Sequence, residues 1–294
     1  MKTDIIVKIL CNESNNMYIC GTGFFVSSNG HILTSAHNCT PNCVLSVYYN
    51  NCIFSAQLIC YDNCLDVALV KTSIKNPDYL TFSTYIKEGD SCYSIGYKYE
   101  DSLAMFQKGI VTHLNYPSWE HFDAFLTSIA GYKGLSGSPI FNSEQQLIGI
   151  LNWKKSNGSG CANISAISMW LNYALINNKS LQSHALEITT TPLYIQDILF
   201  NKIDKLKCNI HGELVTQSNI PKVKKGDILL AVDNTAVGIT SMSSRHLCYF
   251  KNTTTVTLSL LHLNNKNKQY EYVKRIVAKI APFNFTDSLS HIKI

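Results

Sequence analysis

The sequence lacks a hydrophobic run long enough to cross a membrane. Hydrophobic residues make up 46% of the 294 positions and charged residues only 15%, but no apolar stretch approaches the roughly 18 residues that a spanning helix needs. The apolar stretch at residues 5–10 is short, is interrupted by Lys8 and is not followed by a small-residue cleavage site. We therefore expect a first β-strand there, no membrane span, no secretory signal and an intracellular location.

Positive charge is not concentrated in any part of the sequence. The net charge is +5, but the lysines are scattered among asparagines and form no basic stripe. A protein that binds nucleic acid usually carries such a stripe, so we expect no nucleic-acid partner. The sequence also contains no internal repeat and no low-complexity tract.

Cysteine, in contrast, is abundant. The chain has 11 cysteines, an odd number, and without a secretory signal most of them are expected to be reduced thiols. The pairs Cys39/Cys43 and Cys60/Cys64 have a spacing that could hold zinc, but on strands and loops this spacing is more often incidental. We therefore expect no metal site.

The length of the chain predicts two domains, because one domain usually contains roughly 100 to 200 residues. Up to about residue 168, short β-branched and aromatic runs alternate with glycine-rich and asparagine-rich turns, which indicates an all-β unit. A helical pattern then extends from Ser168 to Ala185, with serine as its N-cap. We place a first domain at residues 1–187, a smaller second domain at 188–281 and a tail at 282–294.

Three polar residues have the types and surroundings that nucleophilic catalysis requires. The turn at residues 134–139 places Ser136 between glycines, so that the backbone N–H groups of Gly134 and Ser136 can form an oxyanion hole. His37 ends one strand and Asp66 begins another. Each residue alone has an ordinary structural explanation, such as a core histidine or a turn-capping acid. Together, in the order His, Asp, Ser, they indicate a catalytic triad.

The motifs that carry these residues resemble those of the trypsin-like fold and, within it, the HtrA/Deg serine proteases. They are G-T-G-F-F-V-S-S-N-G-H-I-L-T-S-A-H at 21–37, D-V-A-L-V-K at 66–71 and G-L-S-G-S-P-I-F-N at 134–142. The stretch K-G-D-I-L-L-A-V-D-N at 225–234 is similar to the core of a PDZ domain.

The resemblance implies a chymotrypsin-like double β-barrel followed by a PDZ-like α/β domain. It further implies a serine endopeptidase that works through an acyl-enzyme without metal or organic cofactor. Protein or peptide substrates are the expected partners, and the PDZ-like domain is expected to take a peptide ligand. The alternative is a binding or structural protein that keeps the protease fold and uses the PDZ-like domain as an adaptor.

The family pattern also predicts the specificity pocket. Its floor lies six residues before the nucleophile, at Ala130, which carries no charge. We expect small or medium aliphatic side chains to be preferred there. The expected neighbours in the pocket are Ile150, Leu151, Asn152, Ile164 and Ala166.

The sequence departs from its relatives at three places. Trypsin-like zymogens carry an aspartate just before the nucleophile, but here that residue is Leu135, so activation by a salt bridge to a new N-terminus is not available. The stretch 193–196, the candidate carboxylate-binding loop of the PDZ-like domain, lacks the usual glycine. Cys20 and Cys39 flank the histidine strand as a disulfide does in secreted trypsin-like enzymes, and the resemblance leaves this bridge open.

Overall fold

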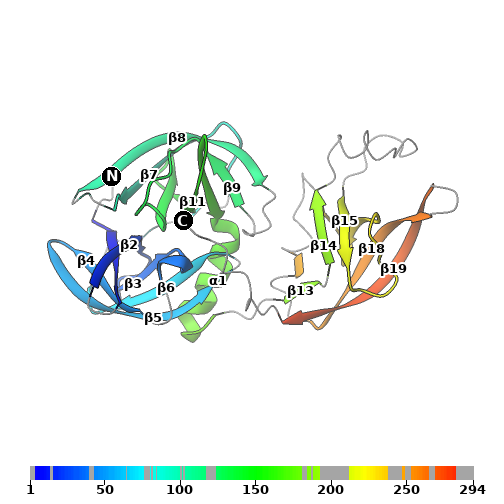
Figure 1. Cartoon of the computed structure of the whole chain (residues 1–294), viewed down its shortest axis with the longest axis horizontal. Helices are drawn as coiled ribbons and strands as arrows, with labels where there is room; N and C mark the ends of the chain where they lie inside the picture. Colours follow the sequence, from blue (N-terminus) through cyan, green and yellow to red (C-terminus); the bar gives the residue numbers. More distant parts are fainter. Residues whose placement is uncertain are drawn as a thin grey trace. The chain divides into compact units, whose positions relative to one another are not determined.

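The computed structural model divides the chain into two compact units, residues Met1–Leu181 and Gln182–Ile294. Figure 1 shows the strands and the single labelled helix of the described part. The structure describes residues 4–13, 16–39, 43–63, 65–75, 80, 82–83, 85–99, 101, 103–116, 124–180, 184–186, 188–192, 212–237, 247–248, 253–264 and 269–282.

The first unit begins with a closed six-stranded barrel. Its strands are β1 (Ile6–Glu13), β2 (Asn16–Phe25), β3 (His31–Thr34), β4 (Val44–Tyr49), β5 (Cys52–Asp62) and β6 (Val67–Thr72). They follow the order β1-β2-β3-β6-β5-β4, and antiparallel pairing of β1 with β4 closes the ring. The first strand is the one expected from the apolar stretch at 5–10. Closure leaves no unpaired strand edge in this barrel.

A second closed barrel follows in the same unit. It contains β7 (Ser91–Tyr97), β8 (Ala104–Tyr116), β9 (Ala124–Thr127), β10 (Ser138–Asn142), β11 (Leu147–Lys155) and β12 (Gly158–Asn163). The strand order is β10-β11-β12-β9-β8-β7, closed by β10 and β7. Its interior is apolar, with Phe125, Ile140 and Leu151 among the buried side chains. The double β-barrel expected from the sequence is confirmed.

The helix that closes the first unit begins earlier than the sequence analysis predicted. Helix α1 covers Ile164–Asn177, rather than Ser168 to Ala185. Its N-cap is Asn163, whose side chain accepts a hydrogen bond from the backbone N–H of Ser165, a typical capping interaction. The helix ends at Asn178, which adopts the left-handed conformation with φ 52°. Ser168 lies inside the helix, where its hydroxyl donates to the carbonyl of Ser165.

None of the helices in the described ranges is long and apolar enough to cross a membrane.

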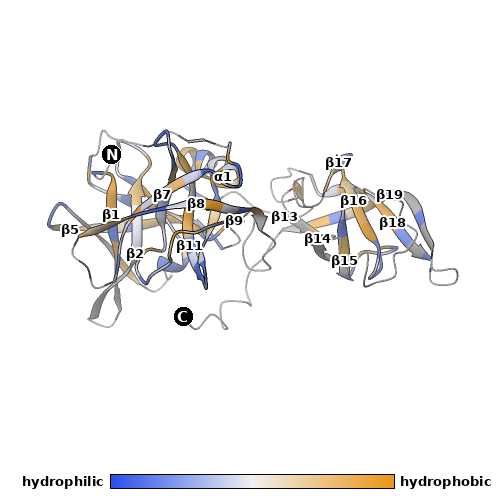
Figure 2. Cartoon of the chain, turned by 90° about the horizontal axis from the view of Figure 1, so that it is seen from above, coloured by the Kyte–Doolittle hydropathy of each residue, from blue (hydrophilic) through white to orange (hydrophobic). Residues whose placement is uncertain are grey.

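The second unit is built around one seven-stranded sheet. The strands are β13 (His184–Leu186), β14 (Ile188–Pro192), β15 (Glu213–Ser218), β16 (Ile228–Val232), β17 (Thr235–Ala236), β18 (Thr255–Asn264) and β19 (Gln269–Pro282). The hydrophobic colouring of β16 in Figure 2 agrees with the burial of Ile228, Leu229 and Val232. The PDZ-like motif at 225–234 forms the turn before β16, the strand itself and the turn after it. The expected carboxylate-binding loop at 193–196 lies outside the described residues.

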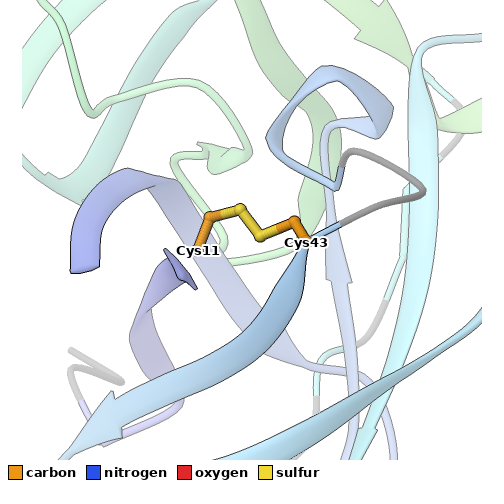
Figure 3. Close-up of a disulfide and its surroundings, with 2 residues drawn as sticks. All are labelled: Cys11 and Cys43. Carbon is orange, nitrogen blue, oxygen red and sulfur yellow. A yellow bond between two sulfur atoms is a disulfide. The ribbon is translucent and has the colours of Figure 1, made fainter. Parts of the chain in front are cut away.

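A disulfide between Cys11 and Cys43 joins β1 to the residue just before β4 (Figure 3). The two Cα atoms are 5.7 Å apart, and the bridge spans 32 positions of sequence. Cys11 and Cys43 are thus exceptions to the expectation that most of the cysteines are reduced thiols. Cys64 lies outside the described residues, as does the side chain of Cys20.

Candidate active site

His37 and Asp66 meet at one end of the first barrel. His37 lies on the short 3-10 helix η1 (Ala36–Asn38) that follows β3, and Asp66 immediately precedes β6. Because β3 and β6 are antiparallel neighbours, with Thr34 opposite Ala68, the end of one lies beside the start of the other. Nδ1 of His37 lies 2.8 Å from Oδ2 and 3.1 Å from Oδ1 of Asp66.

The backbone strengthens this pair. The N–H of His37 donates to Oδ1 of Asp66 at 3.1 Å, so the carboxylate is bound by both the ring and the main chain of the histidine. Asp66 has a φ of 51°, in the left-handed region that aspartate tolerates better than most residues. The sharp turn directs its side chain back toward η1.

The pair is partly shielded from solvent, which changes the acid–base behaviour of the imidazole. The side chain of His37 is 28% exposed and that of Asp66 only 11%. Desolvation is the largest influence on the pKa of His37 and lowers it. The charge of Asp66 and its hydrogen bond act in the opposite direction and together raise the pKa above the ordinary 6.5.

The side chain of Asn152, a predicted pocket residue, holds the aspartate turn. This side chain is buried, and Nδ2 donates to the carbonyls of Leu65 and Asp66 at 3.3 and 3.1 Å. Its Oδ1 accepts from the hydroxyl of Ser35 at 2.8 Å. Asn152 belongs to β11, so these contacts connect the second barrel to the turn that carries Asp66.

Ser136 lies on a tight loop just before β10. Gly134 and Gly137 have φ values of 89° and 87°, which L-residues rarely adopt. A Cβ on Gly134 would lie 2.6 Å from both the carbonyl oxygen of Tyr97 and the nitrogen of Tyr99, so space as well as conformation requires glycine there.

The N–H groups around Ser136 divide into bonded and available donors. The N–H of Leu135 donates to Tyr132, and that of Gly137 to Leu151. Within the described part of the chain, the N–H groups of Gly134 and Ser136 donate to no residue. Two free donors, two positions apart on one loop, are what an oxyanion hole requires. The hydroxyl of Ser136 donates to the carbonyl of Asn152 at 3.3 Å.

Thr22 ties this loop to the first barrel. Its hydroxyl donates to the carbonyl of Gly134 and its backbone N–H to the carbonyl of Ser136, both at 2.8 Å. Sequence reasoning missed this role, although Thr22 stands within the Gly-Thr-Gly motif. The partners lie more than 110 positions apart, and no local pattern predicts that pairing.

The remaining predicted pocket residues are mostly inside the protein. Ile150, Leu151, Ile164 and Ala166 are all at most 1% exposed. Ala130 is partly exposed, and its carbonyl accepts a hydrogen bond from Nε2 of Gln107 at 3.2 Å. The structure thus places Ile150, Leu151, Ile164 and Ala166 in the packed interior. Within the described ranges, no group of three or more histidine, cysteine and acidic side chains could hold a metal.

The comparisons with known proteins agree with this arrangement. Residues 21–150 match the model of the trypsin-like peptidase domain. A probable periplasmic serine endoprotease DegP-like of Chlamydia pneumoniae is 26% identical over 76% of this chain and 48% of the relative. A protein of the same name from Halomonas elongata is 26% identical over 76% of this chain and 50% of the relative. The chain thus spans about half the length of these curated relatives.

Solved structures support the fold over almost the whole chain. The HtrA-type protease AlgW with tripeptide superposes with a TM-score of 0.71 at 17% identity, over 96% of this chain and 95% of that chain. The serine endoprotease from Yersinia pestis gives a TM-score of 0.65 at 19% identity, over 96% and 95% of the two chains.

The names of the relatives correct one expectation. Several are called periplasmic, which contradicts the intracellular location expected from the sequence. The Cys11–Cys43 disulfide is consistent with this correction, because disulfides persist mainly in oxidising compartments. The matched domain model, the double barrel and the relatives agree: residues 21–150 form a trypsin-like peptidase domain, and the chain is similar to serine proteases of the HtrA/Deg type.

Proposed function

We propose that the chain is a serine endopeptidase in which Ser136 is the nucleophile, His37 the general base and Asp66 the residue that orients the base. The bidentate contact between His37 and Asp66 is the observation that carries the proposal. Because Nδ1 is bonded to the carboxylate, Nε2 is the nitrogen that remains to accept a proton.

The reaction proceeds through an acyl-enzyme. Ser136 Oγ attacks the scissile carbonyl while His37 takes its proton, and the N–H groups of Gly134 and Ser136 stabilise the oxyanion. His37 then protonates the leaving amine, and a water molecule activated by the same imidazole hydrolyses the ester. Before attack, the Ser136 hydroxyl must exchange the carbonyl of Asn152 for Nε2. A serine side chain reorients easily, and such contacts often tighten only when substrate binds.

Extended peptide segments are the proposed substrates. Two related HtrA-type protease structures are described as carrying a tripeptide and a decapeptide. Ala130 supplies no negative charge to the proposed pocket, and two lysines contact the residues that follow it. The stem of Lys154 packs on Gly131, and Nζ of Lys98 lies 4.4 Å from the ring centre of Tyr132.

This charge distribution predicts the residue preferred before the scissile bond. Small or medium aliphatic residues such as valine, alanine or leucine should be favoured, and lysine and arginine should be disfavoured because Ala130 offers them no counter-ion. A peptide library analysed by mass spectrometry measures the preference directly. Cleavage mainly after basic residues would overturn this part of the proposal.

For residues 188–281 we propose a PDZ-like unit that binds peptides or regulates the protease domain. The sheet of β14, β15, β16, β18 and β19 and the motif at 225–234 support this assignment. The competing function is a binding protein that retains the protease fold. The Ser136 hydroxyl bonded to a main-chain carbonyl, rather than to His37, is compatible with that alternative.

Labelling with a fluorophosphonate probe separates the two functions. The full chain should be labelled at Ser136, because the probe reacts only with a serine that is activated by a base and faces an oxyanion hole. Ser136→Ala should abolish labelling and lower turnover on the order of 10⁶-fold. Ser138→Ala, which changes a buried serine two positions away, is the matched control and should label normally. An unlabelled but folded wild-type chain would favour the binding protein.

A further inference from the structure

Asn38, directly after the proposed base, lies between the histidine turn and the nucleophile loop. It is the last residue of η1 and is only 1% exposed. Its amide packs on the backbone of Gly21, where any Cβ would collide with it. Glycine at 21 therefore makes room for the Asn38 side chain.

The amide nitrogen of Asn38 makes two hydrogen bonds. Nδ2 donates to the carbonyl of Ser136 at 2.9 Å and to Oγ1 of Thr34 at 3.0 Å. The Thr34 hydroxyl donates its own hydrogen to the carbonyl of Thr22 at 2.6 Å, so toward Asn38 it can only accept. Both partners are acceptors, which fixes the amide with its nitrogen, not its oxygen, toward Ser136.

In this orientation the amide oxygen of Asn38 forms no hydrogen bond within the described part of the chain. This oxygen, Oδ1, is buried. An unpaired buried acceptor lowers the stability of the fold, and an apolar side chain of similar size would avoid that loss. Stability alone therefore does not explain asparagine at this position.

We infer that Asn38 is a positioning residue that fixes Ser136 relative to His37, an inference that rests on the proposed function. The carbonyl of Ser136 accepts from both Asn38 and the N–H of Thr22, so both of its lone pairs are occupied. With only the Thr22 bond, the peptide that follows Ser136 can pivot about a single contact. With both bonds, its plane is fixed, and the Cα that carries the nucleophilic hydroxyl is fixed with it.

The Asn38 bond affects the reaction because it links the nucleophile to the turn that carries the base. His37 and Asn38 are consecutive residues of η1, so the turn that places the imidazole also holds the Ser136 carbonyl. A displacement of about 1 Å between reacting groups can lower a rate about 100-fold. The Asn38 tether restricts that displacement without touching substrate.

The experiment compares three variants of the full chain. Asn38→Val removes both donors, Asn38→Ser keeps one, and Thr72→Val removes a buried hydroxyl that bonds Gly30 and Ile74 at the far end of β6. For each we would measure the rate of fluorophosphonate labelling, kcat and KM on a short peptide, and Tm. Asn38→Val should lower labelling and kcat about 10- to 100-fold, leave KM unchanged, and keep or raise Tm. Asn38→Ser should lie between it and the wild type.

The control variant and the results that would refute the inference can be told apart by labelling rate and Tm. Thr72→Val should lower Tm but label at the wild-type rate, because its hydroxyl is remote from Ser136. Wild-type labelling by a folded Asn38→Val chain would refute the inference and leave the proposed function intact. A loss of activity in Asn38→Val that only parallels a loss of Tm would also refute it. A wild-type chain that does not label would remove the proposed function, and this inference with it.

Discussion

At the scale of single residues, the protonation of His37 sets the pH dependence of the proposed reaction. Only the neutral imidazole can act as the base, and Asp66 raises the pKa of His37 above 6.5. Labelling of Ser136 should therefore rise with pH, with a midpoint above 6.5. Rates measured between pH 5 and 9 would test this, and a flat profile would argue against His37 as the base.

Asp66→Asn provides the matched control for this prediction. Without the carboxylate, desolvation remains and the midpoint should move below that of the wild type. The rate should also fall about 10⁴-fold, because the amide favours the wrong imidazole tautomer.

The ion pair between His37 and Asp66 stabilises the fold most when His37 is protonated. Its contribution is therefore complete below the ordinary pKa of 6.5 and is lost as pH rises through the raised pKa.

Sequence could predict the residues proposed to act chemically but not those proposed to position them. Ser136, His37 and Asp66 stand in short motifs that can be recognised locally. Thr22 and Asn38 contact the Ser136 loop across the two barrels, and only the folded chain brings them there. The pocket illustrates the same limit. Ile164 is a predicted pocket residue, but it is fully buried at the start of α1.

At the scale of elements, the disulfide should account for a measurable part of the stability of the first barrel. Cross-linking positions 32 apart removes conformational freedom from the unfolded chain, which corresponds to about 3 to 4 kcal/mol on the entropic model. Cys11→Ser, or reduction of the wild type, should lower the free energy of unfolding by an amount of this order. Denaturant titration followed by circular dichroism would measure the change.

Cys52→Ser is the control, because this cysteine is an exposed free thiol on β5. It should have the same stability as the wild type both with and without reductant. If Cys11→Ser and Cys52→Ser unfold at the same denaturant concentration, the bridge contributes no stability in solution.

The boundaries of helix α1 show why sequence patterns locate elements better than their ends. Its apolar periodicity was recognised around Trp170, Leu171 and Ala174, which are fully buried. The error lay in choosing Ser168 as the cap. Asn163 caps equally well in principle, and only the end of strand β12 at that residue decides between the two.

At the scale of the whole molecule, we predict that the first unit is an independent catalytic core. It contains both barrels, α1 and every residue of the proposed triad and oxyanion hole. A chain ending at residue 187 should fold and cleave a short aliphatic peptide at close to the full-length rate. Cleavage of a casein-like protein should change more, because the second unit is proposed to bind or regulate.

Circular dichroism of the shortened chain is the necessary control. If it is folded and cleaves neither substrate, the second unit completes the active site and the proposed division of labour is wrong.

The double barrel could be predicted because its motifs span both barrels. The second unit was harder to predict because its similarity rests on one short motif, which fixes a strand and its turns but not the topology around them.

The hydrogen bonds that join Thr22 to the Ser136 loop should make the rate of catalysis sensitive to the contacts between the two barrels. Each barrel closes on itself through its own main-chain ladder, whereas only a few hydrogen bonds, including those of Thr22 and Asn38, join the Ser136 loop to the first barrel. Heating should break these contacts between the barrels before it unfolds either barrel, since openings that break few buried contacts need less free energy. Catalytic activity would then be lost while the circular dichroism spectrum remained native, and activity would return on cooling.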